Sequence, residues 1–336
     1  MIASERRYAR MVACAGYAPD DILTNTALAE RVDTTDEWIA ARTGIRERRI
    51  ARSDQATSDL AVQAARRVLD QAGVEPGALD VVIVGTCTPD HLFPSTASLV
   101  CEDLGIRAGS FDLVNACSSW VYGLAQGCGL IEAGIAENVL VLGADTLSRI
   151  TDWGDRSTCV LFGDGAGGAL LTSSPTSDGY GFLAFDLGTE PDRASLVLGA
   201  GGSRQPANQG HANGPEGYIA MNGRAVFKWA SRMIVESTER LLARAGLAPD
   251  DVDLFVPHQA NLRIIEHALE RTGIPPDRVV VNIDRFGNTS AASVPLALGE
   301  AFEQGRVRDG DVVLAIGFGA GLAHAGTILR YGGGHR

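Results

Sequence analysis

The sequence predicts an α/β protein made of two similar halves, stacked as α/β/α/β/α layers about a pseudo-twofold axis. Three observations predict this fold class: an internal repeat, alternating strand-like and helix-like segments in each half, and a glycine content of 40 residues that suits tight turns. We place the N-terminal half at residues 1–180 and the C-terminal half at residues 181–336.

The repeat is clearest in two segments that lie 173 positions apart. Residues 58–80 (SDLAVQAARRVLDQAGVEPGALD) align without gaps on residues 231–253 (SRMIVESTERLLARAGLAPDDVD), and eight of the 23 positions are identical. Each copy has the pattern of an amphipathic helix that ends at a glycine, Gly73 or Gly246, with a proline shortly after it. A short apolar strand is expected after each helix.

The remaining segments of the two halves follow the same order. A strand and turn at 111–117 (FDLVNAC) correspond to 279–288 (VVVNIDRFGN), a helix at 118–134 to 289–305, and a strand at 139–145 to 312–319. This alternation predicts a mostly parallel sheet covered by helices in each half.

The repeat also relates three residues with chemical potential. At the local offset of 171, Cys117 superposes on Asn288, and each lies where a strand turns into a helix. His258 lies at the end of the strand at 254–259. Because duplicated α/β folds bring such strand ends to a shared crevice, we expect these three side chains to meet.

Composition excludes several classes of function. The net charge of -12 disfavours a nucleic-acid partner, and no apolar run approaches the roughly 20 residues of a membrane span. The N-terminal residues lack the apolar stretch of a signal peptide, so we expect a cytoplasmic protein with no membrane association. The cysteines show no metal-binding spacing; apart from Cys117, we expect them to be small hydrophobes in the core (Cys14, Cys87, Cys101, Cys128, Cys159).

The three residues suit the chemistry of thioesters. A cysteine at a helix N-terminus, beside an imidazole, is expected to have a lowered pKa and to accept an acyl group. N–H groups of His258 and Asn288 could hold a thioester carbonyl and stabilise the enolate that forms when a β-carboxylate leaves as CO2. The sequence therefore predicts condensation of an acyl thioester with a decarboxylating malonyl thioester, a step that needs no metal or cofactor.

The segment GDGAGG at 163–168 matches the GxGxxG pattern of dinucleotide sites. It lies between the strand-like segments STCVLF and ALLTS, whereas a dinucleotide site needs a helix next. We interpret it as a tight strand–turn–strand that packs near the crevice.

The motifs, taken in their order and spacing, resemble those of β-ketoacyl-acyl-carrier-protein synthase III, the initiating condensing enzyme of the thiolase superfamily. The matching stretches are TDEWIAARTGIRERR (35–49), NACSSW (115–120), FGDGAGG (162–168), MNGRAVFKWA (221–230), PHQANLRI (257–264), GNTSAASVP (287–295) and GFGAGL (317–322). The resemblance implies a thiolase-like fold, a homodimer, and a ping-pong mechanism in fatty acid or polyketide chain initiation. An acyl-CoA would be the primer, and malonate on acyl carrier protein would extend it.

The resemblance also implies roles for individual residues. Cys117 would be acylated, His258 and Asn288 would hold the malonyl thioester, and the backbone of Cys117, Gly319 and Ala320 would form the oxyanion hole. The residues implied to bind CoA are Trp38, Arg42, Arg156 and Asn261, with the adenine between Trp38 and Arg156. The acyl pocket would be lined by Phe93, Trp120 and Phe318. Acyl carrier protein would dock on Lys228, Arg263 and Arg271. Phe93 would reach across the dimer to close the partner's pocket.

This sequence departs from the family pattern near the expected acyl pocket. Ser118, Ser119 and Trp120 stand where a small residue, Gly and Phe are common, while Leu322 replaces Phe and His324 replaces Trp. Trp120 could line the acyl tunnel or pack behind it against the strand at 139–145.

These departures leave the primer and the acceptor open. One alternative is a transferase or thioesterase of the same fold that passes the acyl group to a hydroxyl, an amine or water. Another is a non-catalytic subunit of a heteromeric synthase. The intact His258 and Asn288 pair favours condensation, because transfer to a hydroxyl needs a base but no enolate stabilisation.

Overall fold

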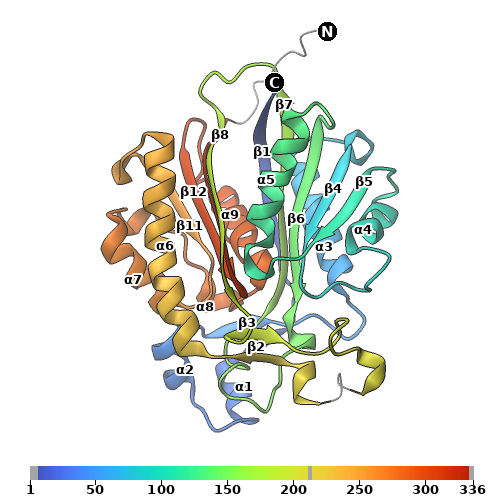
Figure 1. Cartoon of the computed structure of the whole chain (residues 1–336), viewed down its shortest axis with the longest axis vertical. Coiled ribbons are helices and arrows are strands. Elements are labelled where there is room, and N and C mark those ends of the chain that lie inside the picture. Colours follow the sequence, from blue (N-terminus) through green and yellow to red (C-terminus); the bar gives the residue numbers. More distant parts are fainter. Residues whose placement is uncertain (1–6, 211–213, 333–336) are drawn as a thin grey trace.

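Two β-sheets organise the molecule in the computed structural model, which describes residues 7–210 and 214–332 (Figure 1). The first sheet has the strand order β1 (Tyr8–Tyr17), β7 (Asp164–Ser174), β6 (Asn138–Thr146), β4 (Val81–Gly85), β5 (Gly109–Leu113). The second has the order β8 (Gly181–Asp192), β13 (Gly321–Arg330), β12 (Val312–Gly319), β11 (Leu254–Pro257).

Helices form the three layers that enclose these sheets. The middle layer consists of α5 (Ser119–Glu132) and α9 (Ser293–Glu303), and both contact strands of both sheets (Figure 1). The outer layers are α3 (Thr57–Ala72) and α4 (Thr96–Leu104) on the first sheet, and α6 (Gly223–Ala245) and α7 (Leu262–Thr272) on the second. The predicted α/β/α/β/α fold class is therefore confirmed. Among the described residues, no helix has both the length and the apolar character required to cross a membrane.

The two sheets are related by the predicted duplication, but they are mixed rather than mostly parallel. In the first sheet β4 is parallel to β5 and β6, while β7 is antiparallel to both β6 and β1. In the second sheet β11 is parallel to β12, while β13 is antiparallel to β12 and β8. The expectation of a mostly parallel sheet was wrong because it rested on the central strands alone.

The second half also lacks a full counterpart of β5. The segment at 279–288 forms two isolated bridges, Val279 with Phe255 and Asn288 with Phe162, on either side of the short helix α8 (Ile283–Phe286). The helices of the repeat end as predicted, at Gly73 and Gly246 in the left-handed conformation. Helix α6 begins at Gly223, well before the repeat, with the side chain of Asn222 as its N-cap.

The backbone corrects the residue-by-residue match between the halves near the site. One-turn 3-10 helices at Ala116–Ser118 and Ser290–Ala292 precede α5 and α9, and both Ala116 and Ser290 have positive φ, of 48° and 53°. These features lie 174 positions apart, so the counterpart of Cys117 is Ala291. The offset of 171 predicted that Asn288 superposes on Cys117. In the structure Asn288 instead lies three residues before Ala291, the true counterpart of Cys117.

The glycine-rich segment at 163–168 lies mostly within β7, which begins at Asp164. Residues 157–161 form turns and Phe162 makes only an isolated bridge with Asn288, so the strand–turn–strand interpretation was wrong, although a strand does continue after the motif. A Cβ at Gly167 would lie 2.6 Å from the backbone nitrogen of Leu296. The glycines thus allow α9 to pack directly on the strand.

Small elements lie at the lower end of the molecule in Figure 1. They are β2 (Ile22–Thr24) paired with β3 (Glu47–Arg49), α1 (Asn25–Ala29), α2 (Asp36–Thr43), and β9 (Leu196–Leu198) paired with β10 (Ile219–Met221).

Candidate active site

Cys117 lies in a tight turn between β5 and α5 that two serines hold in place. Ser119 Oγ accepts a hydrogen bond from the Asn115 backbone N–H and donates one to the Ala116 carbonyl, each at 2.7 Å. Ser118 Oγ donates to the Asn115 carbonyl at 2.7 Å. The serines that depart from the family pattern therefore bond to the backbone of the nucleophile turn, which also contains the positive φ of Ala116.

The end of β12 passes directly against this turn. A Cβ at Gly319 would lie 2.8 Å from the Cys117 backbone nitrogen, and one at Gly317 would lie 3.0 Å from the Cys117 carbonyl oxygen. Only glycine allows so close an approach at these two positions. The backbone groups expected to form the oxyanion hole, those of Cys117 and Gly319, are thereby brought together.

His258 directly follows β11 and is 1% exposed. Its backbone N–H donates to the Ile316 carbonyl at 2.8 Å, and its ring stands nearly edge-on to Phe318 with centroids 4.9 Å apart. The Nδ1 atom is buried with no hydrogen-bond partner among the described residues. The position of the imidazole is thus fixed by its backbone and by Phe318, and its ring nitrogens are available to bind a ligand or to accept a proton.

Asn288 is fixed by its own backbone and by the turn that follows it. Its N–H donates to the Leu161 carbonyl at 2.8 Å, and its carbonyl accepts from the Gly163 N–H at 3.0 Å. Its side-chain Oδ1 accepts from the Ser290 N–H at 2.9 Å. Because the amide oxygen is engaged in this way, the amide N–H groups are the part of the side chain left to donate.

Burial governs the protonation of the site. It raises the pKa of the Cys117 thiol to about 12, with a smaller contribution from the charge of Asp145, and it lowers the pKa of His258 to about 3. The expectation that the pKa of this cysteine is lowered was wrong for the free site, because desolvation by burial outweighs the interactions that favour the thiolate. At neutral pH the site holds a thiol beside a neutral imidazole.

Two cavities meet at Cys117. The first, of about 630 Å³, is lined by Cys117, His258 and Asn288 together with Phe318 and Gly319. The second, of about 420 Å³, has mainly apolar walls. Both are lined by Cys117, Phe162 and Leu196. The structure thus brings the three predicted catalytic residues to one cavity and opens a separate apolar space at the same thiol.

The four residues expected to bind CoA all line the first cavity: Trp38, Arg42, Arg156 and Asn261. The guanidinium carbons of Arg42 and Arg156 lie 4.6 and 5.0 Å from the centroid of the Trp38 ring. Arg156 therefore stacks on the indole itself, and it would have to move aside for an adenine to enter between them. Asn261 caps α7 and donates from Nδ2 to the Arg42 carbonyl at 3.2 Å.

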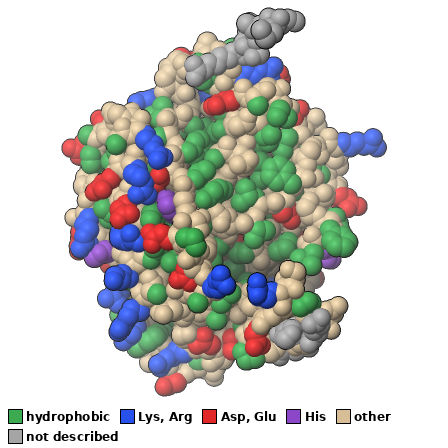
Figure 2. Space-filling view, viewed as in Figure 1, with side chains coloured by type: hydrophobic (Ala, Val, Ile, Leu, Met, Phe, Trp, Pro, Cys, Tyr) green, Lys and Arg blue, Asp and Glu red, His purple; other side chains and the backbone are tan. Residues whose placement is uncertain are grey.

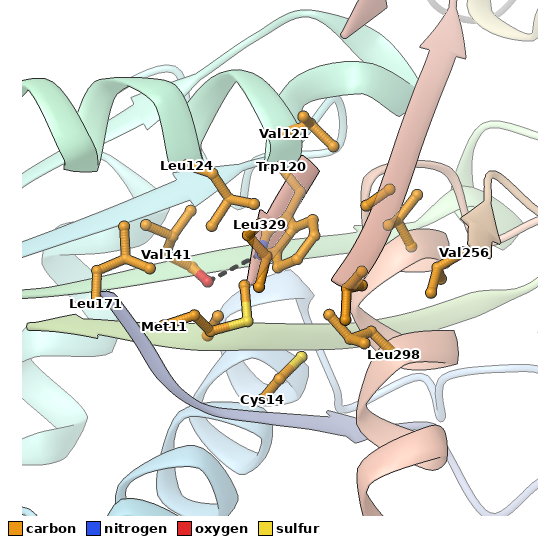
Figure 3. Close-up of a cluster of buried hydrophobic side chains, with 14 of the residues drawn as sticks. Met11, Cys14, Trp120, Val121, Leu124, Val141, Leu171, Val256, Leu298 and Leu329 are labelled. Carbon is orange, nitrogen blue, oxygen red and sulfur yellow. Dashed lines mark hydrogen bonds between the residues drawn. The ribbon is translucent and has the colours of Figure 1, made fainter. Parts of the chain in front are cut away.

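Trp120 does not line either cavity, which corrects its place in the expected acyl pocket. It is 1% exposed, and its indole N–H donates to the Val141 carbonyl of β6 at 3.0 Å (Figure 3). Figure 3 shows the ring among Leu124, Met11 and Leu329. It packs behind the pocket, which was the alternative interpretation of this residue.

The other two residues of the expected acyl pocket lie in different environments. Phe318 lines the first cavity rather than the apolar one. Phe93 is 86% exposed and lines neither cavity within a single chain. A phenylalanine so exposed is compatible with the expected reach into a partner subunit.

The side chains of the two departures at the C-terminal turn line neither cavity. Leu322 packs in the core that covers the second sheet. His324 is buried beside Asp186, with 3.2 Å between Nε2 and the carboxylate, and Arg240 joins the same group. Leu322 therefore lies beside the cavities, next to the lining residue Gly321, without contributing to their walls.

The residues expected to dock a carrier protein occupy neighbouring surfaces. Lys228 and Arg271 line a groove of about 500 Å³ between α6 and α7, and Arg263 lines the mouth of the first cavity. Figure 2 shows basic side chains gathered over α6 and α7, interspersed with acidic ones.

Sequence reasoning missed several residues that line the cavities. Arg224 and Phe227 lie at the first cavity, within the matched stretch 221–230, so the motif could have indicated them. Cys87 lines the second cavity, although we expected it to be an ordinary core residue. Ser290 lines it too and lies within the matched stretch 287–295, so that motif could have indicated it, whereas no residue pattern pointed to Cys87.

Comparison with known proteins agrees with this geometry. Residues 111–191 match the family 3-oxoacyl-[acyl-carrier-protein (ACP)] synthase III, and residues 242–331 match its C-terminal region. The β-ketoacyl-[acyl-carrier-protein] synthase III of Symbiobacterium thermophilum is 50% identical over 316 residues, which cover 94% of this chain and 95% of the relative.

Solved structures agree as well. The β-ketoacyl-[acyl-carrier-protein] synthase III of Thermus thermophilus has a TM-score of 0.90 at 47% identity and covers 97% of this chain and 100% of its own. The priming β-ketosynthase of the R1128 polyketide pathway has a TM-score of 0.91 at 36% identity, covering 99% and 98%. Over nearly its whole length, this chain belongs to the 3-oxoacyl-[acyl-carrier-protein] synthase III family.

Proposed function

We propose that Cys117, His258 and Asn288 carry out the initiating condensation of fatty acid or polyketide synthesis in this chain. As a member of its family the chain is an acyltransferase, and the reaction joins an acyl-CoA primer to malonyl-acyl carrier protein with loss of CO2. One observation carries the proposal: a single cavity is lined by all three residues, and a second, apolar cavity opens at the same thiol. The apolar cavity suits the primer chain, and the larger one suits the carrier arm.

The first half-reaction transfers the primer to Cys117. The thiol attacks the thioester carbonyl of the acyl-CoA, and because burial keeps the sulfur protonated, a base must take its proton. The neutral imidazole of His258 lines the same cavity and can do so. Backbone N–H groups of Cys117 and Gly319 are close enough together to hold the oxyanion, and CoA then leaves as a thiol.

The second half-reaction uses the two polar side chains as donors. The malonyl thioester carbonyl binds between His258 and the amide N–H of Asn288, and loss of CO2 leaves an enolate on that oxygen. The enolate carbon attacks the acyl carbonyl on Cys117 and releases a 3-oxoacyl thioester. Donors that are buried and already oriented stabilise the developing charge more strongly than water would. We expect no metal or cofactor to be required, which assays in the presence of a chelator can test.

The relatives disfavour transfer to a hydroxyl, amine or water. The Symbiobacterium relative and the Thermus structure, at 50% and 47% identity, are both named as β-ketoacyl-[acyl-carrier-protein] synthase III. Simple acyl transfer would use His258 as a base but would give the amide donor of Asn288 no task.

We further propose that the chain acts as a homodimer. Strand β5 is last in its sheet order, and its outer edge pairs with no other strand among the described residues. Phe111 on this strand and Val114 just after it are exposed, as are Leu92 and Phe93 in the loop after β4. An unpaired edge strand beside exposed apolar side chains favours association with a second copy. Association of this kind would carry Phe93 toward the partner's primer cavity.

Mass spectrometry of the intact protein separates the two half-reactions. With acyl-CoA, the wild type should gain one acyl mass and Cys117→Ala none, while Cys101→Ser serves as a control that keeps the adduct. His258→Ala and Asn288→Ala should lose malonyl decarboxylation by about 10²–10³-fold each. Asn288→Ala should still acylate at the wild-type rate. Equal acyl labelling of Cys117→Ala would overturn the proposal.

A further inference from the structure

A second thiol lies beside the proposed nucleophile. Cys87 follows β4, is partly exposed, and lines the apolar cavity together with Cys117. Among the described residues, no other cysteine lines either of the two cavities that meet at Cys117. Neither the condensation nor the binding of CoA gives Cys87 a task.

Ser290 influences both thiols. Ser290 Oγ lies 3.3 Å from Cys87 Sγ, and the Ser290 hydroxyl also lowers the pKa of the Cys117 thiol, against the larger effect of burial, which raises it. Ser290 is held for this role by its positive φ and by the bond from its N–H to Asn288 Oδ1.

The fold brings the two turns to the same edge of the first sheet. β4 and β5 are parallel neighbours with Gly85 opposite Leu113, so the turns that follow them leave the sheet side by side. Neighbouring strands lie about 4.8 Å apart. Cysteines that form a disulfide have Cα atoms about 4.4–6.8 Å apart, a separation compatible with this arrangement. The bond from the Cys87 N–H to Asp145 Oδ1, at 2.8 Å, holds one of the two turns, so closure requires rotation of the Cys87 thiol away from Ser290.

We propose that Cys87 and Cys117 form a reversible disulfide when a peroxide oxidises Cys117. In the first step the Cys117 sulfur attacks one peroxide oxygen, the O–O bond breaks, and the thiol proton passes through His258 to the departing hydroxide, which leaves as water. In the second step the Cys87 sulfur attacks the sulfenic acid, the S–O bond breaks and a second water leaves. The two thiols together lose two electrons and two protons, which reduce hydrogen peroxide to water.

The pair prevents deeper oxidation of the nucleophile. A sulfenic acid without a neighbouring thiol proceeds to the sulfinic acid, which thiol reductants do not reverse. Burial raises the pKa of both thiols, so the resting pair stays protonated and reacts only when a base takes the proton. An acyl group on Cys117 blocks the first step, so acyl-CoA protects the enzyme.

The test is thiol mapping after exposure of the reduced, full-length enzyme to hydrogen peroxide. After free thiols are capped with N-ethylmaleimide, a digest of the wild type should contain the Cys87 peptide linked to the Cys117 peptide. Dithiothreitol should remove the link and restore condensation, and preloading with acyl-CoA should prevent the link. Cys101→Ser is the matched control and should behave as the wild type does.

Cys87→Ser should accumulate sulfinic acid at Cys117 and regain about tenfold less of its own starting activity with dithiothreitol. The proposal is overturned if the wild type yields no linked peptide, or if Cys87→Ser recovers as the wild type does. Should the variant fold poorly, the wild-type peptide map decides alone. The link does not require that Cys117 be acylated in turnover, so a missing acyl adduct would refute the proposed function without touching the disulfide.

Discussion

The placement of Trp120 gives a prediction that separates stability from primer choice. Replacing Trp120 with Phe removes an indole N–H that donates to the Val141 carbonyl at 3.0 Å, in a core where the side chain is 1% exposed. Loss of a buried hydrogen bond costs about 1 kcal/mol. The smaller ring leaves a void of roughly 40 Å³, which costs about 1 kcal/mol more. We therefore expect the free energy of unfolding to fall by about 2 kcal/mol.

Urea unfolding and a primer series together test this expectation. Trp153→Phe is the matched control, because its indole N–H also donates to a carbonyl, that of Ser148 at 3.2 Å, but its side chain is only partly buried. It should lose less stability than Trp120→Phe. The relative kcat/KM values for acyl-CoAs of increasing length should match the wild type in both variants. A change of about tenfold or more in favour of longer primers, with stability unchanged, would show that the indole lines the primer cavity.

Three further predictions concern the surface, the dimer and pH. Arg263→Glu should raise KM for malonyl-acyl carrier protein more than KM for malonyl-CoA, and high salt should have the same effect on the wild type. Arg66→Glu on α3 is the control, and equal effects on the two donors would argue against a docking role. Phe93→Ala should broaden the range of primer lengths in a protein that remains dimeric, and an unchanged range would mean that other residues close the pocket. Burial lowers the pKa of His258 to about 3 in the folded state, from 6.5 in the unfolded chain. Below pH 6.5 the unfolded chain therefore binds a proton that the folded state does not, and the free energy of unfolding should fall by about 2–3 kcal/mol between pH 7 and pH 4.5. Thermal unfolding at the two pH values should show a smaller loss in His258→Ala than in the wild type or in His91→Ala, an exposed control, and equal losses would refute the assignment.

The layers and helix ends could be predicted because they depend on local patterns. The amphipathic repeat located α3 and the later part of α6, together with the left-handed glycines that end them. The same patterns did not predict the backbone conformation of the turns. Ala116 and Ser290 have positive φ although neither is a glycine, so the sequence did not show that these two residues correspond. The predicted alignment of the two turns was therefore wrong by three residues. The boundary between the halves at residue 180 stays a prediction, as does a cytoplasmic location.

Side-chain direction in the middle layer could not be predicted either. Helix α5 contacts strands of both sheets, so apolar residues occur on more than one of its faces and periodicity does not distinguish a tunnel wall from the core. Trp120 illustrates this ambiguity, since either interpretation fitted the sequence. Cys87 was missed for a related reason: a cysteine after a buried strand resembles a core residue until the neighbouring turn is known.

The burial of the site explains how one arrangement can serve both half-reactions. A thiolate and an imidazolium placed in the free site would each lose hydration, and their attraction would have to offset that loss. The structure instead favours the neutral pair, since burial raises the pKa of Cys117 to about 12 and lowers that of His258 to about 3. Acylation then removes the thiol altogether, so its proton no longer needs a place in the site. What remains is a neutral imidazole and an amide whose oxygen is already engaged by Ser290, both free to donate to an enolate in the absence of competing charge. Desolvation therefore makes the free thiol less nucleophilic but strengthens the hydrogen bonds that stabilise the enolate in the second step. His258 can act as a base before acylation and as a hydrogen-bond donor after it.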